Sequence, residues 1–291
     1  MRSYQELVER ALQKQTTISR IVIEEEKTRT GRSETELVEK MKANYTVMQE
    51  SVVQGMTGTW KSLSGLTGGD AALLENYRLS GKSLLGDKVN RAAARAMAVA
   101  EVNAGMGRIV AAPTAGSCGV LPGVLLTVNE SLCREDDAVV AALFTAAGIG
   151  MVIAERASVS GAEGGCQAEI GAAAAMSAAA AVELAGGTPE QTAHASAMAL
   201  KSFLGLVCDP VAGLVEVPCV KRNASAAVIA LTAAEMALAG IKSAIPLDEV
   251  IDAMASIGRN MPCSLKETAQ GGLAVTPAAE KLRERLVPCQ P

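Results

Sequence analysis

The sequence is rich in hydrophobic residues but almost devoid of aromatic ones, and this contrast constrains the core more than any other feature. Hydrophobic residues make up 49% of the chain, whereas Phe, Trp and Tyr together account for 2%. The interior must therefore be filled by Ala, Gly, Val, Leu and Met, and helices with such small side chains can approach one another closely. We expect an all-α protein, a compact bundle of Ala/Gly-rich helices with cysteine-bearing loops between them.

Apolar residues recur at helical spacing through most of the chain. Polar surface helices are expected over residues 3–26 and after Ser33–Glu36, which reads as a capping box. The glycine-rich stretch 55–69 is expected to be irregular. Ala-rich helices are predicted over residues 88–106, 138–157, 167–184 and 223–239, and two more helices begin at Pro189 and Pro246.

We predict one helical domain over residues 1–291. Its polar N-terminal helices occupy about residues 1–50, and its core occupies about residues 85–291. The N-terminal helices are the part that we expect to be available for contact with a partner.

Charge and composition exclude several classes of partner. The net charge is -4, and the sequence shows neither a basic stripe nor an aromatic stacking platform, so we expect no nucleic acid to bind. The apolar run 138–154 stops at Glu155-Arg156, short of a comfortable membrane span, so we expect a buried helix and no membrane. Seven cysteines without a secretory signal indicate the reducing cytoplasm.

Two cysteines bracket a segment that cannot be helical throughout. Cys208 and Cys219 lie in CDPVAGLVEVPC, where Pro210 and Pro218 lack a backbone N–H and Gly213 adds conformational freedom. The chain must turn here. A turn leaves backbone N–H groups pointing into the enclosed space, which is a common environment of sulfur-ligated metals.

A third cysteine, Cys166, lies among glycines in GAEGGCQAEIG, residues 161–171. With Cys208 and Cys219 it forms a set of candidate metal ligands from separate loops. No CxxC pair occurs, which argues against ribbon-type zinc sites and thioredoxin-like redox chemistry, whereas iron–sulfur centres accept dispersed cysteines. Buried inert cysteines are the alternative explanation, and Cys118 stays open as a fourth ligand.

Two other loops are candidates for binding an anion. Thr114 and Ser117 offer hydroxyls in a proline-bounded loop with exposed backbone N–H groups, which suits a small carboxylic acid, although a structural turn explains the same pattern. Lys266 and Thr268 lie beside a Gly-Gly pair and form a second candidate anion-binding site, although an exposed lysine beside a turn explains the same pattern. The single histidine, His194, falls on a helix among small residues and is expected to be a packed or capping residue.

The sequence closely resembles the alpha chain of the bacterial iron–sulfur-dependent L-serine dehydratases over most of its length. The matching segments are APTAGSCGVLPG (112–123), EGGCQAEIGAA (163–173), GLVCDPVAGLVEVPCVKRN (205–223), MPCSLKETAQGGLA (261–274) and a cysteine at the extreme C-terminus. The resemblance implies that Cys166, Cys208 and Cys219 hold three irons of a [4Fe-4S] cluster, with the fourth iron open for substrate. It also implies that Cys289 enters the empty active site.

The reaction implied is the α,β-elimination of water from L-serine, giving pyruvate and ammonia. Serine has a poor leaving group and a weakly acidic α-proton, so the reaction needs a Lewis acid on the oxygen and a base at the α-carbon. The substrate-binding candidates are Thr114, Ser117, Lys266 and Thr268, and the catalytic candidates are Cys289 and Lys266.

The identity of the base stays open among His194, Lys266, Glu163 and the Cys289 thiolate. In the family that the chain resembles, a beta chain or a fused domain contributes a histidine-bearing loop, and nothing in this sequence resembles that domain. We therefore expect an obligate beta chain in a heteromer.

Three other functions are possible for this sequence. A pyridoxal-phosphate dehydratase catalyses the same net reaction through a lysine Schiff base, and Lys266 is the candidate lysine, but the sequence lacks the alternating strands expected of that fold. An absorption spectrum separates an iron–sulfur band from an aldimine band. An iron–sulfur redox sensor without turnover is the second alternative, and a membrane protein, excluded by recovery without detergent, is the third.

Overall fold

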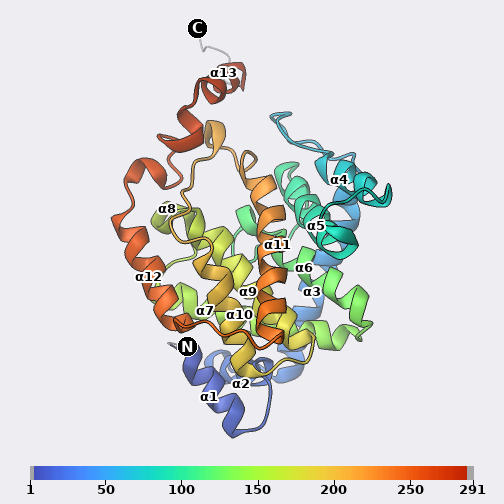
Figure 1. Ribbon diagram of the computed structural model, residues 1–291, viewed down its shortest axis with the longest axis vertical. Helices are drawn as coiled ribbons and strands as arrows, with labels where there is room; N and C mark the ends of the chain where they lie inside the picture. Colours follow the sequence, from blue (N-terminus) through green and yellow to red (C-terminus); the bar gives the residue numbers. More distant parts are fainter. Residues whose placement is uncertain (1–2, 287–291) are drawn as a thin grey trace.

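The computed structural model describes residues 3–286, in which thirteen α-helices and several short helical turns occur and no β-strand is formed. The prediction of an all-α bundle is confirmed (Figure 1). The helices are α1 (Tyr4–Gln13), α2 (Ile18–Thr30), α3 (Glu34–Met56), α4 (Asp70–Leu79), α5 (Gly86–Ala104), α6 (Val120–Leu132), α7 (Asp136–Arg156), α8 (Gly161–Gly164), α9 (Ala172–Leu184), α10 (Pro189–Lys201), α11 (Cys219–Leu238), α12 (Leu247–Asn260) and α13 (Pro277–Leu286). The short turns are η1 (Ala115–Ser117), the π-helical η2 (Gln167–Gly171), η3 (Val211–Gly213), η4 (Cys263–Leu265) and η5 (Gly272–Val275).

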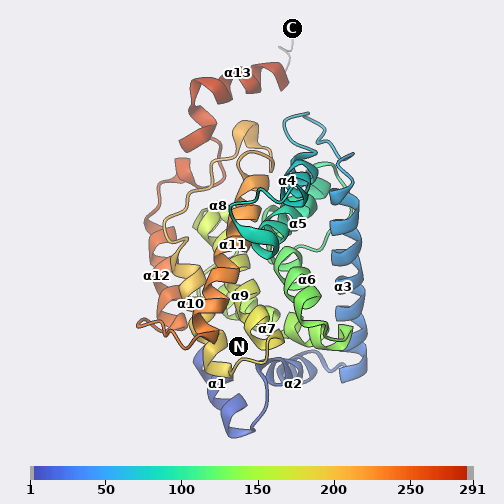
Figure 2. The ribbon, with the colours of Figure 1, turned by 45° about the vertical axis from the view of Figure 1, so that its right-hand side comes forward.

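Helix α9 is the centre of the bundle. Every residue of α9 except Glu183 is buried, and most of them are alanines. A helix that is apolar all round must be enclosed by other elements, and α6, α7, α10 and α11 pack around it (Figures 1 and 2). One side of α9 faces a core cluster shared with α7, and the opposite side faces a cluster shared with α11.

Small residues at the helix crossings allow the close packing that the composition predicts. A Cβ on Gly119, just before α6, would lie 1.9 Å from the carbonyl oxygen of Ala96 on α5. On α3, a Cβ on Gly55 would lie 2.2 Å from the carbonyl oxygen of Ala98. Both distances are far below any allowed contact, so these two crossings exist only because glycine stands there.

The N-terminal helices lie at the end of the molecule opposite α13 (Figures 1 and 2). The stretch 3–26, expected to be helical, is interrupted at residues 14–17, where Gln15 adopts a left-handed conformation with φ 51° and Thr17 caps α2. Tyr4, Leu7 and Ile21 belong to the same core cluster as α7 and α9. These amphipathic helices therefore bury their apolar sides in the main core, and their outer sides carry ion pairs such as Lys14 with Glu24.

Helix α7 is, within residues 3–286, the one helix that is long and apolar enough to cross a membrane. In this fold 61% of its most apolar window is buried, and the helix packs against α2, α3 and α9. It is a core helix of the bundle, as the sequence predicts.

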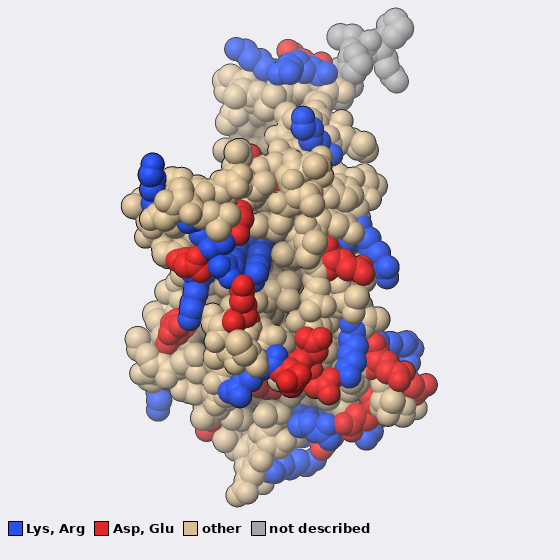
Figure 3. Space-filling model, turned by 90° about the vertical axis from the view of Figure 1, so that its right-hand side faces the viewer, with Lys and Arg blue, Asp and Glu red and all other residues tan. Residues whose placement is uncertain are grey.

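Figure 3 shows one face of the molecule on which basic and acidic side chains are interspersed, and no basic stripe crosses that face.

The C-terminal segment returns to the cysteine-bearing loop. After α12, the chain passes through η4 and η5 to α13, and η5 and α13 both pack against η3 in the segment between Cys208 and Cys219. A single backbone bridge joins Cys208 to Lys266, with the Cys208 N–H donating to the Leu265 carbonyl at 2.9 Å. This end of the bundle is therefore assembled from two segments that are distant in the sequence, the loop between Cys208 and Cys219 and the segment 263–286.

Candidate metal centre

Two of the three candidate cysteines stand at the beginning of long helices. Cys166 precedes η2, which continues directly into α9, and Cys219 is the first residue of α11. The helix that was expected from residue 223 thus begins four residues earlier, because Pro218 lies just outside it and blocks no intrahelical hydrogen bond. The N-terminal end of a helix carries partial positive charge, which favours thiolates.

Cys208 lies in an extended segment before η3, as expected of a stretch that cannot be helical throughout. The segment is fixed on both sides by backbone hydrogen bonds. The Cys208 carbonyl accepts from the Glu267 N–H at 3.0 Å, and the preceding Leu206 carbonyl accepts from the Gln167 N–H at 3.0 Å. Cys208 is therefore held between η2 and the C-terminal segment.

The three thiols act on one another's pKa. A hydrogen bond from Cys208 lowers the pKa of Cys166, and the Arg222 guanidinium adds to this effect. The same hydrogen bond raises the pKa of Cys208, since Cys208 keeps its proton to donate it. Burial, and then the negative charge of Cys166, raise the pKa of Cys219 to about 12. The three sulfurs thus share one electrostatic environment.

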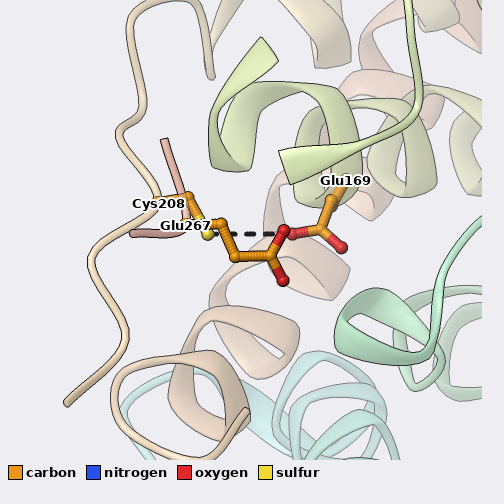
Figure 4. A group of neighbouring side chains, drawn as sticks. All are labelled: Glu169, Cys208 and Glu267. Atoms are coloured by element: carbon orange, nitrogen blue, oxygen red, sulfur yellow. Dashed lines mark hydrogen bonds between the residues drawn. The ribbon is translucent and has the colours of Figure 1, made fainter. Parts of the chain in front are cut away.

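Two carboxylates complete this environment (Figure 4). The sulfur of Cys208 and one carboxylate oxygen each of Glu169 and Glu267 lie within 4.8 Å of one another. Glu169 Oε2, 3.9 Å from the Cys208 sulfur, is a second acceptor within reach of the Cys208 proton, and the Thr114 hydroxyl donates to Glu169 Oε1 at 2.6 Å. Burial raises the pKa of Glu169, and the charge of Glu267 raises it further. A Cβ on Gly161 would lie 2.5 Å from Glu169 Oε2, so a larger residue there would displace this carboxylate.

An arginine completes the lining of the site. The guanidinium of Arg222, in the first turn of α11, donates to the Val207 carbonyl and to Asp209 Oδ1, each at 2.9 Å. Burial acts to lower the pKa of Arg222, but the charges of Cys166 and Asp209 outweigh it and the pKa is raised.

Two buried amides join the cysteine-bearing segments to their surroundings. Asn223 accepts from the Gly119 N–H at 2.9 Å and donates to the carbonyls of Gly116 and Cys219 at 2.8 and 2.9 Å. Gln167 donates to the Gly164 carbonyl at 2.9 Å and accepts from the Gly205 N–H, also at 2.9 Å. Both side chains are fully buried, so each hydrogen bond is costly to lose.

The predicted anion-binding residues fall into two groups. Thr114 lies at the site through Glu169, and Ser117, fully buried, is 3.2 Å from the Thr114 hydroxyl. Lys266 borders Cys208 through its backbone, and its amino group makes no ion pair with residues 3–286. Thr268 donates to the Cys263 carbonyl within its own turn. The structure therefore links Thr114 to Cys208 through Glu169, and it places the Lys266 backbone directly beside Cys208.

The other candidates lie elsewhere. His194 is on α10, where it lines two surface hollows with residues that include Ser243 and Lys242, and burial lowers its pKa. Glu163 is exposed on α8. Cys118 is fully buried in a small apolar cluster with Val52 and Val99, and burial raises its pKa to about 12, as expected of an inert core cysteine. Cys289 lies outside the described residues.

Sequence reasoning missed Glu169 and Arg222. Each stands three residues after a candidate cysteine at the start of a helix, Glu169 after Cys166 and Arg222 after Cys219. Residues three apart share one face of a helix. A search for charged residues at that offset would have found both.

The residues present fit an iron–sulfur cluster. Cysteine thiolates are the usual ligands of such clusters, and here three thiols from separate segments meet around two helix N-termini and one arginine. The pKa of Cys208 is raised by its hydrogen bond to Cys166 and by burial, and the pKa of Cys219 is raised by burial and by the charge of Cys166. Iron would supply positive charge that favours the thiolate form of each. Among the described residues, the one set of three potential metal-ligand atoms that lie within 4.8 Å of one another belongs to Cys208, Glu169 and Glu267, and the three cysteine sulfurs do not form such a set.

Comparison with known proteins identifies relatives across nearly the whole chain. The family described as "Serine dehydratase alpha chain" matches residues 13–274. The chain is 53% identical to a probable L-serine dehydratase alpha chain of Bacillus subtilis (strain 168), over 98% of this chain and 95% of that one. It is 44% identical to the L-serine dehydratase alpha chain of Peptoniphilus asaccharolyticus, over 90% of each chain.

A longer relative matches nearly the whole of this chain. The chain is 41% identical to the L-serine dehydratase of Streptomyces coelicolor (strain ATCC BAA-471 / A3(2) / M145), over 94% of this chain but only 60% of that protein. Some relatives thus carry further sequence beside the part matched here. The match over residues 13–274, together with relatives of this identity and coverage, shows that the chain belongs to the serine dehydratase alpha chain family.

Proposed function

We propose that the protein is a lyase that removes water from L-serine and yields pyruvate and ammonia. The observation that carries the proposal is the meeting of three cysteine thiols from separate segments at one end of the bundle, in a chain whose relatives are named L-serine dehydratases. Loss of water gives aminoacrylate, which tautomerises and hydrolyses without help from the protein. No observation favours the pyridoxal-phosphate or redox-sensor alternatives.

The proposed cofactor is a [4Fe-4S] cluster held by Cys166, Cys208 and Cys219. When bound, it supplies a Lewis acid with one open coordination position, which makes the serine hydroxyl a better leaving group. Three protein thiolates leave that position free, whereas four would favour electron transfer.

The chain's own residues are proposed to bind and orient the amino acid. The Lys266 amino group has no ion-pair partner among residues 3–286 and is the candidate for the substrate carboxylate, and the Thr114 hydroxyl contributes from the opposite loop. Ser117 fixes Thr114, and Thr268 is the remaining candidate from the C-terminal segment. The carboxylates of Glu169 and Glu267 leave negative charge beside Cys208, where the substrate ammonium group is attracted.

The base is proposed to come from a beta chain. Within residues 3–286 the only histidine stands on α10, outside the cysteine site. Two relatives are named as alpha chains, and the longer Streptomyces coelicolor protein has additional sequence. We therefore propose a heteromer that acts in the cytoplasm. Full serine turnover by the isolated, reconstituted chain would refute the need for a partner.

The experiment that tests the function combines metal analysis with an assay. Protein purified without oxygen, alone and with its partner, is analysed for iron and acid-labile sulfide, and pyruvate formation from L-serine is measured. Cys166→Ser, Cys208→Ser and Cys219→Ser are each expected to lose cluster and activity together. Cys133→Ser is the matched control, since Cys133 is exposed at the end of α6. Activity that survives in the three variants would contradict the proposal.

A further inference from the structure

Arg222 is the best-anchored charged residue beside the cysteines. Its guanidinium uses both terminal nitrogens, one on the Val207 carbonyl and one on Asp209 Oδ1. The partner Asp209 is nearly fully buried, with 4% of its side chain exposed, and 18% of the Arg222 side chain is exposed. These two hydrogen bonds use two of the five N–H groups of the guanidinium and fix its orientation against the Cys208 segment.

Asp209 extends this ion pair to a third segment. Its second oxygen, Oδ2, accepts from the Leu273 N–H at 2.8 Å, just after Gly272. A Cβ on Gly272 would lie 2.6 Å from Asp209 Oδ2, and Gly272 has φ +59°, so glycine is required for this approach. The pair of Arg222 and Asp209 therefore ties the first turn of α11 to the Cys208 segment and to η5.

The charge balance of the site requires a cation. Three thiolates carry more negative charge than a [4Fe-4S] core carries positive charge, so the bound centre is an anion, and Glu169 and Glu267 add to it. A buried anion without a counter-charge is costly. Among the described residues, Arg222 is the basic residue whose charge acts on both Cys166 and Cys219.

We propose that Arg222, fixed by Asp209, is the counter-cation of the cysteine-held cluster, and that it governs both how firmly the cluster is retained and how readily it is reduced. It is a positioning residue, since it acts through Cys166 and the Val207 carbonyl and contacts no reacting atom. The inference rests on the proposed function, because it requires that the cysteines hold a cluster.

Two substitutions separate a charge effect from a merely structural one. Arg222→Gln removes a positive charge beside the cluster, which disfavours the reduced form and shifts the midpoint potential to more negative values. Asp209→Asn removes a negative charge and is expected to shift the potential in the opposite direction. If Arg222 and Asp209 had a purely structural role, the two variants would not shift the midpoint potential in opposite directions, because both loosen the same contacts.

The experiment uses the heteromer prepared and reconstituted without oxygen. Iron and sulfide content, the rate of iron release to an excess of chelator, and the potential from a redox titration followed by electron paramagnetic resonance are measured for each variant. Arg222→Gln is expected to weaken iron retention by about 10- to 100-fold, the usual effect of removing a group that supports metal ligands. Arg222→Lys keeps the charge and is expected to restore the potential.

Lys221→Gln is the matched control, because Lys221 is the preceding residue, is exposed and pairs with Asp70. It is expected to behave as wild type. The inference is overturned if Arg222→Gln releases iron at the wild-type rate with an unchanged potential. If that variant does not fold, the sign of the shift in Asp209→Asn decides, and an unchanged or lowered potential overturns the inference. A wild-type protein without cluster would instead refute the proposed function.

Discussion

Asn223 is the side chain whose removal tests most sharply how the site is assembled. It is fully buried and joins the loop before α6 to the first turn of α11, through Gly119, Gly116 and Cys219. The substitution Asn223→Ala deletes all three hydrogen bonds and puts no polar atom in their place. We expect it to lower the stability of the fold and to loosen Cys219 together.

The magnitude follows from the groups left without partners. The Gly119 N–H is buried and loses its acceptor, which costs about 2 kcal/mol, and the loss of the bonds to the two carbonyls adds about 0.5–1 kcal/mol each. The Cys219 carbonyl lies in the first turn of a helix, so the loss of its hydrogen bond should cost about 0.5 kcal/mol, the lower end of that range. The expected loss is about 3 kcal/mol, a large part of the stability of a typical domain.

The assay is urea unfolding followed by far-ultraviolet circular dichroism, under reducing conditions. Asn76→Ala is the matched control, because it makes the same chemical change at an exposed position of α4 and should alter the free energy of unfolding by less than about 0.5 kcal/mol. If Asn223→Ala costs less than about 1 kcal/mol at an unchanged dependence on urea, Asn223 does not hold these segments together.

Three further predictions concern the core and the candidate base. Gly119→Ala places a Cβ 1.9 Å from the Ala96 carbonyl oxygen and should cost about 2 kcal/mol, seen as a melting temperature about 4–8 °C lower; an unchanged temperature would mean that α5 and α6 separate freely. Burial raises the pKa of Glu183 in the folded protein above its ordinary value of 4.5. Glu183 therefore stabilises the folded state below that pH, where it is protonated, and this contribution is lost as the pH rises. The stability of Glu183→Gln relative to wild type should therefore increase from about pH 4 to about pH 7, and a constant difference would contradict this. His194→Gln should leave kcat/KM for serine within about twofold of wild type, and a loss above about 100-fold would identify His194 as the base.

Much of the fold could be predicted because its helices are indicated by the spacing of apolar residues and by capping residues in the local sequence. Residues 167–184 form the continuous η2–α9 helix over the predicted range. Of the stretch 55–69 that was expected to be irregular, residues 57–69 are irregular and the first two residues belong to the end of α3. The break after α1 was not predicted, because Gln15 takes a left-handed conformation that only glycine would have signalled. The predicted start of α11 is four residues too late. The prediction assigned Pro218 to the interior of the turn, whereas in the structure the turn ends at Pro218 and the helix begins at the next residue.

The candidate site was less accessible to sequence reasoning. The cysteines stood out as thiols beside prolines and glycines, and the quoted segments indicated the family. The neighbours of Cys208 depend on how η2, α11 and the C-terminal segment cross, and Glu267 reaches it from a left-handed residue with φ 51°. Such contacts between distant segments are set by tertiary packing, which local patterns do not encode.

The metal content of the protein tests the central claim most directly. Protein purified and reconstituted without oxygen should contain iron and acid-labile sulfide in the amounts of one [4Fe-4S] cluster per chain, and Cys166→Ser, Cys208→Ser and Cys219→Ser should each lose it while Cys133→Ser retains it. A wild-type protein that is free of iron and still converts serine to pyruvate would contradict the account.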